Sequence, residues 1–152
     1  MCSFIGSGPI KSYTCPATGE KVEISSSITC TDQGVYLLAC KKETGLCVGV
    51  APTYVGECGD GAQSSFTHRL AGHVGSALQQ CQDDTVKPVG RHFRLQGHDI
   101  RRDLFFLPIE KINKNEPFLR KARESYYIKK FKSVKSKSVW DIEHGLNLDR
   151  GQ

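Results

Sequence analysis

A chain of 152 residues is long enough for one domain with a hydrophobic core and too short for two domains of ordinary size. Its composition of 38% hydrophobic and 24% charged residues is typical of a folded protein, and no apolar run approaches the ~20 residues that a membrane span requires. The start of the sequence lacks the basic and apolar segments of a secretory signal, so we expect an intracellular protein without a membrane partner.

The formal net charge is +5, and the basic residues concentrate after Lys87. A one-sided basic face is the electrostatic signature of a protein that binds a polyanion, although a solvated helix face would have the same composition. The odd count of seven cysteines argues against a disulfide framework and favours buried thiols or metal ligands.

Residues 1–28 are rich in glycine, proline and serine, which predicts a polar N-terminal extension with one short strand at 22–24. The folded domain is expected over 29–149. The compact apolar run 35–39 and the segment 53–56 predict two strands of an antiparallel hairpin.

Apolar residues at helical spacing predict a helix over 66–78, which Ser64 or Ser65 could cap. The run 104–109 predicts a third strand, and Pro108 places that strand at a sheet edge or at a bulge because proline cannot donate a backbone hydrogen bond. A second helix is expected over 117–132, with Pro117 in its first turn. The tail, with Trp140, Leu146 and Asn147, is expected to pack back onto the domain.

Five side chains of these elements have a possible chemical role. Glu124 lies on a partly apolar helix face, where a buried carboxylate needs either an ion pair with a nearby arginine or lysine or a divalent cation. Arg69 is either a surface residue or a guanidinium that neutralises charge on a phosphate. Tyr36 and Tyr54 are either core aromatics or phenols that take part in proton transfer, and His73 is either a core histidine or a base.

The ordered set of motifs resembles the GIY-YIG nuclease superfamily and, more closely, the endonuclease domain of Penelope-like retroelements. Gly34-Val35-Tyr36 matches the first signature and Tyr54-Val55-Gly56 the second, with an insertion at 45–52 between them. The motifs that carry the resemblance are GVYLLAC, YVGEC, HRLAGH, VGRHFRLQGH, RKARESYYI and, near the end, Gly145-Leu146-Asn147.

The resemblance implies an α/β (α+β) fold with a small three-stranded antiparallel sheet flanked by helices. It also implies a divalent-metal-dependent DNA endonuclease that leaves a 3′-hydroxyl, with one Mg²⁺ or Mn²⁺ on Glu124. Tyr36 would be the general base, alone or with His73, and Tyr54 would position the water or phosphate. Arg69 would stabilise the transition state, and Asn147 would contact a phosphate.

Two thiolates and two imidazoles suffice for a tetrahedral structural zinc site, and the resemblance assigns this role to Cys40, Cys47, His92 and His98. His73 could replace one of the histidines, and Cys15 with Cys30 forms an alternative thiol pair.

Basic residues from two segments are expected to contact the nucleic acid backbone: Arg91, Arg94, Arg101, Arg102, Lys129, Lys130 and Lys132. The expected partners are duplex or branched DNA and, for a retroelement enzyme, a reverse transcriptase domain or chain, with the nucleus as the location. Two alternatives remain open: a zinc-stabilised nucleic-acid-binding module without catalysis, and a nuclease that acts on RNA or branched DNA.

Overall fold

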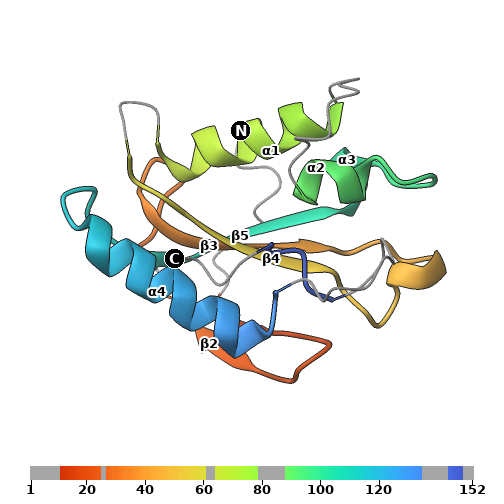
Figure 1. The fold of residues 1–152 in the computed structure, drawn as a ribbon, viewed down its shortest axis with the longest axis horizontal. Coiled ribbons are helices and arrows are strands. Elements are labelled where there is room, and N and C mark those ends of the chain that lie inside the picture. Colours follow the sequence, from red (N-terminus) through yellow and green to blue (C-terminus); the bar gives the residue numbers. More distant parts are fainter. Residues whose placement is uncertain (1–10, 25–26, 61–63, 79–87, 135–143, 149–152) are drawn as a thin grey trace.

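The computed structural model describes residues 11–24, 27–60, 64–78, 88–134 and 144–148 (Figure 1). Its elements, in chain order, are β1 (Ser12–Thr14), β2 (Lys21–Glu23), β3 (Gly34–Cys40), the 3-10 turn η1 (Gly45–Cys47), β4 (Thr53–Cys58), α1 (Phe66–Leu78), α2 (Pro88–Phe93), α3 (Ile100–Asp103), β5 (Leu104–Lys111) and α4 (Pro117–Phe131). None of the helices within these ranges is long and apolar enough to cross a membrane.

The main sheet has three antiparallel strands in the order β4-β3-β5. The central strand β3 is buried along its whole length, which explains why its sequence is a continuous apolar run. Its register with β4 places Tyr36 opposite Gly56 and Leu38 opposite Tyr54. The predicted hairpin, and the mixed fold with a three-stranded antiparallel sheet and flanking helices, are therefore confirmed.

The prediction made from Pro108 is also confirmed. β5 is an edge strand, and its register against β3 shifts between Val35 and Tyr36, whose partners are Glu110 and Pro108. The shift leaves Ile109 as an extra residue at the point where proline lacks a donor, which is the usual place for a bulge.

Helices cover both faces of the sheet (Figure 1). Because successive side chains of a strand point to opposite faces, β3 contributes to two hydrophobic cores. Tyr36, Leu38 and Cys40 pack with α1, α2 and α3 on one face. Val35 and Leu37 pack with α4 on the other face, where the β1–β2 ribbon also lies.

The N-terminal ribbon belongs to this folded unit. Cys15 and Val22 are buried in the same core cluster as Phe131 of α4, and Tyr13 packs against that cluster. From Lys11 onward, the segment expected as a polar extension is therefore integrated with the domain, while residues 1–10 lie outside the described ranges.

Both predicted helices form where their apolar spacing placed them. α4 has Pro117 in its first turn and ends at Lys132, whose left-handed backbone (φ 51°) stops the helix. The short helices α2 and α3 were not predicted, because six and four residues are too few to show a helical repeat. Leu146 and Asn147 pack back onto the domain as expected, whereas Trp140 lies outside the described ranges.

Candidate active site and metal cluster

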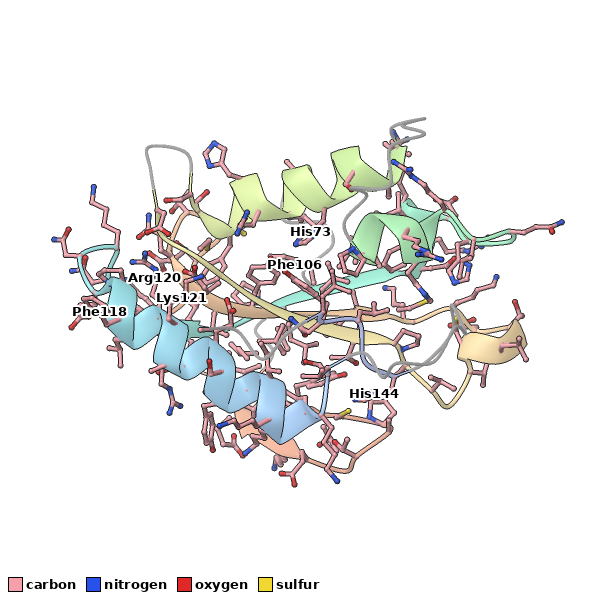
Figure 2. All side chains as sticks on the ribbon, viewed as in Figure 1. His73, Phe106, Phe118, Arg120, Lys121 and His144 are labelled. Atoms are coloured by element: carbon pink, nitrogen blue, oxygen red, sulfur yellow. The ribbon has the colours of Figure 1, made fainter. Side chains whose placement is uncertain are left out.

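The two signature tyrosines lie close to His73 of α1. The Tyr36 hydroxyl is 2.7 Å from His73 Nε2, and the Tyr54 ring centroid is 5.4 Å from that of His73. The ring centroids of Tyr36 and Tyr54 are 6.3 Å apart. Tyr36 is fully buried, whereas Tyr54 is half-buried and reaches the solvent. Figure 2 shows His73 below α1, on the side that faces the sheet.

Gly56 of the second signature is required by the position of Tyr36. A Cβ atom at Gly56 would lie 2.4 Å from the Tyr36 hydroxyl oxygen and 2.9 Å from the Tyr54 ring. Since no side chain fits in this space, the glycine lets both phenols approach β4 at the site.

Arg69 lies one helical turn before His73 and has an exposed side chain. Its guanidinium donates to the backbone oxygen of Glu57, with Nε and Nη2 at 3.4 and 3.3 Å. The cation is therefore held at the outer edge of β4, close to the two tyrosines.

Glu124 approaches the same place from the opposite face of the sheet. It lies on α4, which packs against β4, and its side chain is 9% exposed. Burial raises the pKa of Tyr36 well above its usual range, and the nearby Tyr54 raises it further. Of the weaker effects, the Arg69 cation lowers this pKa, whereas Cys58 and Glu124 raise it. The charges of the guanidinium and of the carboxylate thus have opposite effects on the pKa of the buried phenol.

Asn147 has a bracing position. Its Oδ1 accepts from the Val55 amide (2.8 Å) and from the Ser133 hydroxyl (2.6 Å), and its Nδ2 donates to the Val55 oxygen (2.7 Å). The side chain is buried. Both polar atoms of the side chain are therefore used within the protein, where they hold the tail to β4. The expected contact between Asn147 and a phosphate gains no support from this arrangement.

Cys40, Cys47, His92 and His98 meet at the opposite end of β3 from the Gly34 signature. Their four donor atoms lie within 4.8 Å of one another, and Cys47 Sγ is 3.3 Å from His98 Nε2 and 3.7 Å from His92 Nε2. This cluster could hold a metal ion. It joins β3, the inserted turn η1, α2 and the loop that leads to α3.

The alternative ligands do not join this cluster. His73 is engaged with Tyr36, and Cys15 lies beside His144 on the α4 side of the sheet, with Sγ and Nε2 4.0 Å apart. The described free thiols are Cys15, Cys40, Cys47 and Cys58. Cys30 is disulfide-bonded, so the expectation of thiols alone is wrong for this residue.

The predicted nucleic-acid contacts do not form a single patch. Arg91, Arg101 and Arg102 are exposed on or next to α2 and α3, near the metal cluster, while Lys129 and Lys132 are exposed at the C-terminal end of α4. Figure 1 places these helices on opposite faces of the sheet, so the continuous basic face suggested by the sequence is wrong. Arg94 is partly committed within the fold, since its guanidinium donates to the Ser76 backbone oxygen.

Two residues of the site region were missed by the sequence analysis. Glu57 and Arg120 are both buried, and Arg120 Nε donates to Glu57 Oε2 at 2.9 Å. The only available signal was that Glu57 directly follows the second signature. Pairing across 63 positions is invisible without the fold.

No family model matches the chain, and the searches of curated proteins and of solved structures gave no match either.

Proposed function

We propose that this protein is a divalent-metal-dependent endonuclease of the GIY-YIG type that hydrolyses phosphodiester bonds in DNA. The observation that carries the proposal is the contact between the Tyr36 hydroxyl and His73 Nε2, 2.7 Å apart, in a group that also includes Tyr54 and Arg69. These residues come from two strands and one helix, and the resemblance implies this set for phosphodiester cleavage.

The proton transfer is best assigned to Tyr36 and His73 together. A phenol whose pKa is raised by burial is a poor base on its own, because its anion is disfavoured. An imidazole within hydrogen-bond distance can accept the phenolic proton while Tyr36 takes one from the attacking water. Tyr54 reaches the solvent and is suited to orient that water or a phosphate oxygen.

Arg69 is suited to stabilise the charge that develops on the phosphate. Its side chain is exposed, and the single backbone oxygen that it contacts leaves guanidinium donors for a phosphate. A fixed cation of this kind contributes to phosphoryl transfer because the negative charge grows in the transition state.

Glu124 would hold Mg²⁺ or Mn²⁺. Such ions use one or two carboxylates together with water and substrate phosphate, so one buried carboxylate that raises the pKa of Tyr36 through its charge fits the donor set. The ion would supply Lewis-acid stabilisation of the leaving oxygen.

The Cys40, Cys47, His92 and His98 cluster is proposed to hold structural zinc. In a tetrahedral zinc site a sulfur and a nitrogen ligand lie about 3.5 Å apart, and the two sulfur–nitrogen distances of Cys47 are 3.3 and 3.7 Å. Four protein ligands leave no open position for a substrate, so the site would stabilise the fold and take no part in hydrolysis.

The test is nicking of supercoiled plasmid DNA by the purified protein with Mg²⁺ or Mn²⁺. Glu124→Gln and Arg69→Ala should each lower the nicking rate by about 10²-fold or more, because each removes charge stabilisation from the transition state. Glu116→Gln is the matched control, since it removes an exposed carboxylate at the start of the same helix.

Wild-type nicking rates in Glu124→Gln would refute the assignment. DNA binding without cleavage in the wild-type protein would favour the non-catalytic module instead. Cleavage of RNA or of flap and hairpin substrates in preference to plasmid would support the proposed active-site residues and contradict the proposed substrate.

A further inference from the structure

Glu57 contacts both sides of the candidate active site. It lies in the edge strand β4, directly after Gly56, and its side chain is buried. Its backbone oxygen accepts from the Arg69 guanidinium. Because side chains alternate along a strand, its carboxylate points with Val55 to the face covered by α4.

On that face the carboxylate binds two consecutive residues of α4. Oε2 accepts from Arg120 Nε at 2.9 Å, and Oε1 is 3.0 Å from Lys121 Nζ. Arg120 lies four residues before Glu124, which places the two on the same side of the helix. One residue therefore joins the guanidinium of Arg69 to the helix that carries Glu124. Figure 2 shows Arg120 and Lys121 near the start of α4, where β4 ends.

Arg120 has further hydrogen-bond partners besides Glu57. Its guanidinium also donates to Asp60 and to the Lys114 backbone oxygen (2.6 Å), and it is 1% exposed. Gly59 leaves the space for it, because a Cβ atom there would lie 2.4 Å from Arg120 Nε. A guanidinium with this many contacts cannot shift without breaking several of them, so Glu57 has a rigid partner.

We propose that Glu57 is a positioning residue of the nuclease site, which fixes the separation between Arg69 and Glu124 through its backbone oxygen and its carboxylate. The inference rests on the proposed function. It assigns Glu57 no contact with substrate or metal; the residue acts through Arg69 and through α4.

A second ion pair between a strand and α4 provides a matched control. Glu110 of β5 accepts from Arg123 Nε at 2.9 Å, and Arg123 is adjacent to Glu124 in the sequence. Glu110→Gln also removes a carboxylate that binds α4, but within the described part of the chain Glu110 bonds neither Arg69 nor the two signature tyrosines. A general loosening of α4 should affect both variants, whereas positioning should affect only Glu57.

The first measurement is steady-state nicking by Glu57→Gln, Lys121→Met and Glu110→Gln. Glu57→Gln should lower kcat about tenfold or more with KM for DNA changed less than about threefold, since the loss falls on the transition state. It should also raise the Mg²⁺ concentration that gives half-maximal rate. Lys121→Met, which removes one exposed partner of the carboxylate, should show the same changes to a smaller extent. Glu110→Gln should keep kcat and the Mg²⁺ dependence of the wild-type protein.

The second measurement needs no cleavage. In ¹⁵N-labelled protein, the Nε–H signal of Arg69 should move in Lys121→Met and stay in place in Glu110→Gln, because Lys121 contacts Glu57 and Glu110 does not. If the Arg69 signal shifts but the wild-type protein never nicks DNA, the connection from Lys121 through Glu57 to Arg69 is kept and the proposed nuclease function is refuted. If the wild-type protein nicks DNA, but Glu57→Gln leaves kcat unchanged and Lys121→Met leaves the Arg69 signal in place, the positioning role of Glu57 is overturned and the nuclease function stands. Equal loss of kcat in Glu57→Gln and Glu110→Gln would overturn it as well.

Discussion

The side-chain amide of Asn147 pairs with both backbone groups of Val55, although the two residues are 92 positions apart. Asn147 thereby replaces a missing strand neighbour at the outer edge of β4. On either side of this point, the Thr53 amide and oxygen bond the backbone of His144 and Leu146, and the Glu57 oxygen accepts from Arg69. The outward backbone groups of Thr53 and Val55 and the oxygen of Glu57 therefore have partners along this edge. The candidate site lies at the end of the edge where Arg69 of α1 is the partner.

The first prediction concerns this bracing role. Asn147→Ala should lower the free energy of unfolding by about 2–4 kcal/mol, because it leaves a buried amide and a buried carbonyl of Val55 without partners. Urea denaturation measures the change, and amide exchange at Val55 should accelerate. Asn113→Ala is the control, since the Asn113 side chain makes one exposed bond to the Asn115 amide. A loss of activity without any loss of stability would instead favour the phosphate contact.

The second prediction concerns Gly56. Gly56→Ala should displace Tyr36 from His73 and destabilise the fold by about 1–3 kcal/mol, the usual cost of forcing extra atoms into a packed core. Nicking should fall with it. Gly75→Ala in α1 has open space around its Cβ and should be neutral or stabilising. Thermal unfolding compares the two variants, and equal melting temperatures would contradict the steric argument.

The third prediction concerns the metal cluster. Purified protein should contain about one zinc per chain, and Cys47→Ser should lose it, whereas Cys58→Ser should keep it because Cys58 is a buried free thiol outside the cluster. At free zinc a thousandfold above its Kd, binding stabilises the native state by about 4 kcal/mol. In a protein of this size, loss of the metal should therefore lower Tm by about 8–16 °C. Retention of zinc by Cys47→Ser, measured by elemental analysis, would contradict the assignment.

The fourth prediction concerns pH and the Cys15–His144 pair. Burial lowers the pKa of His144, but the contacts with Cys15 and the Phe131 oxygen outweigh it and raise the pKa to about 9. The pKa of Cys15 falls to about 7, since contacts with His144 and Thr18 outweigh the opposing effect of burial. Taken alone, the raised pKa of His144 makes stability fall as pH rises from about 6.5 to 9. Taken alone, the lowered pKa of Cys15 makes stability rise between pH 7 and 9, so the two effects oppose each other in the wild-type protein.

Cys15→Ser removes the thiolate and, with it, the contact that raises the pKa of His144 most. Both opposing effects therefore weaken together, and the His144 ring should titrate at lower pH in the variant than in the wild-type protein. NMR titration of the ring checks this. A ring that titrates at the same pH in both proteins would contradict the ion pair.

Local sequence patterns predicted the elements that are long or chemically distinctive. The apolar run of β3, the helical spacing of α1 and α4, and Pro108 at an edge all follow from short-range rules of burial and backbone hydrogen bonding. The four donors of the metal cluster were named through the resemblance, and the structure brings all four together.

What the sequence by itself determined is therefore the set of elements and the kinds of side chain that they carry. Only the tertiary structure decided which of these residues meet: Tyr36 with His73, Glu57 with Arg120, and Asn147 with Val55. It also separated the basic residues of α2 and α3 from those of α4, which the sequence had suggested as one face. The physical reason is that burial and periodicity act over a few residues, whereas these contacts depend on how the two faces of one sheet are covered.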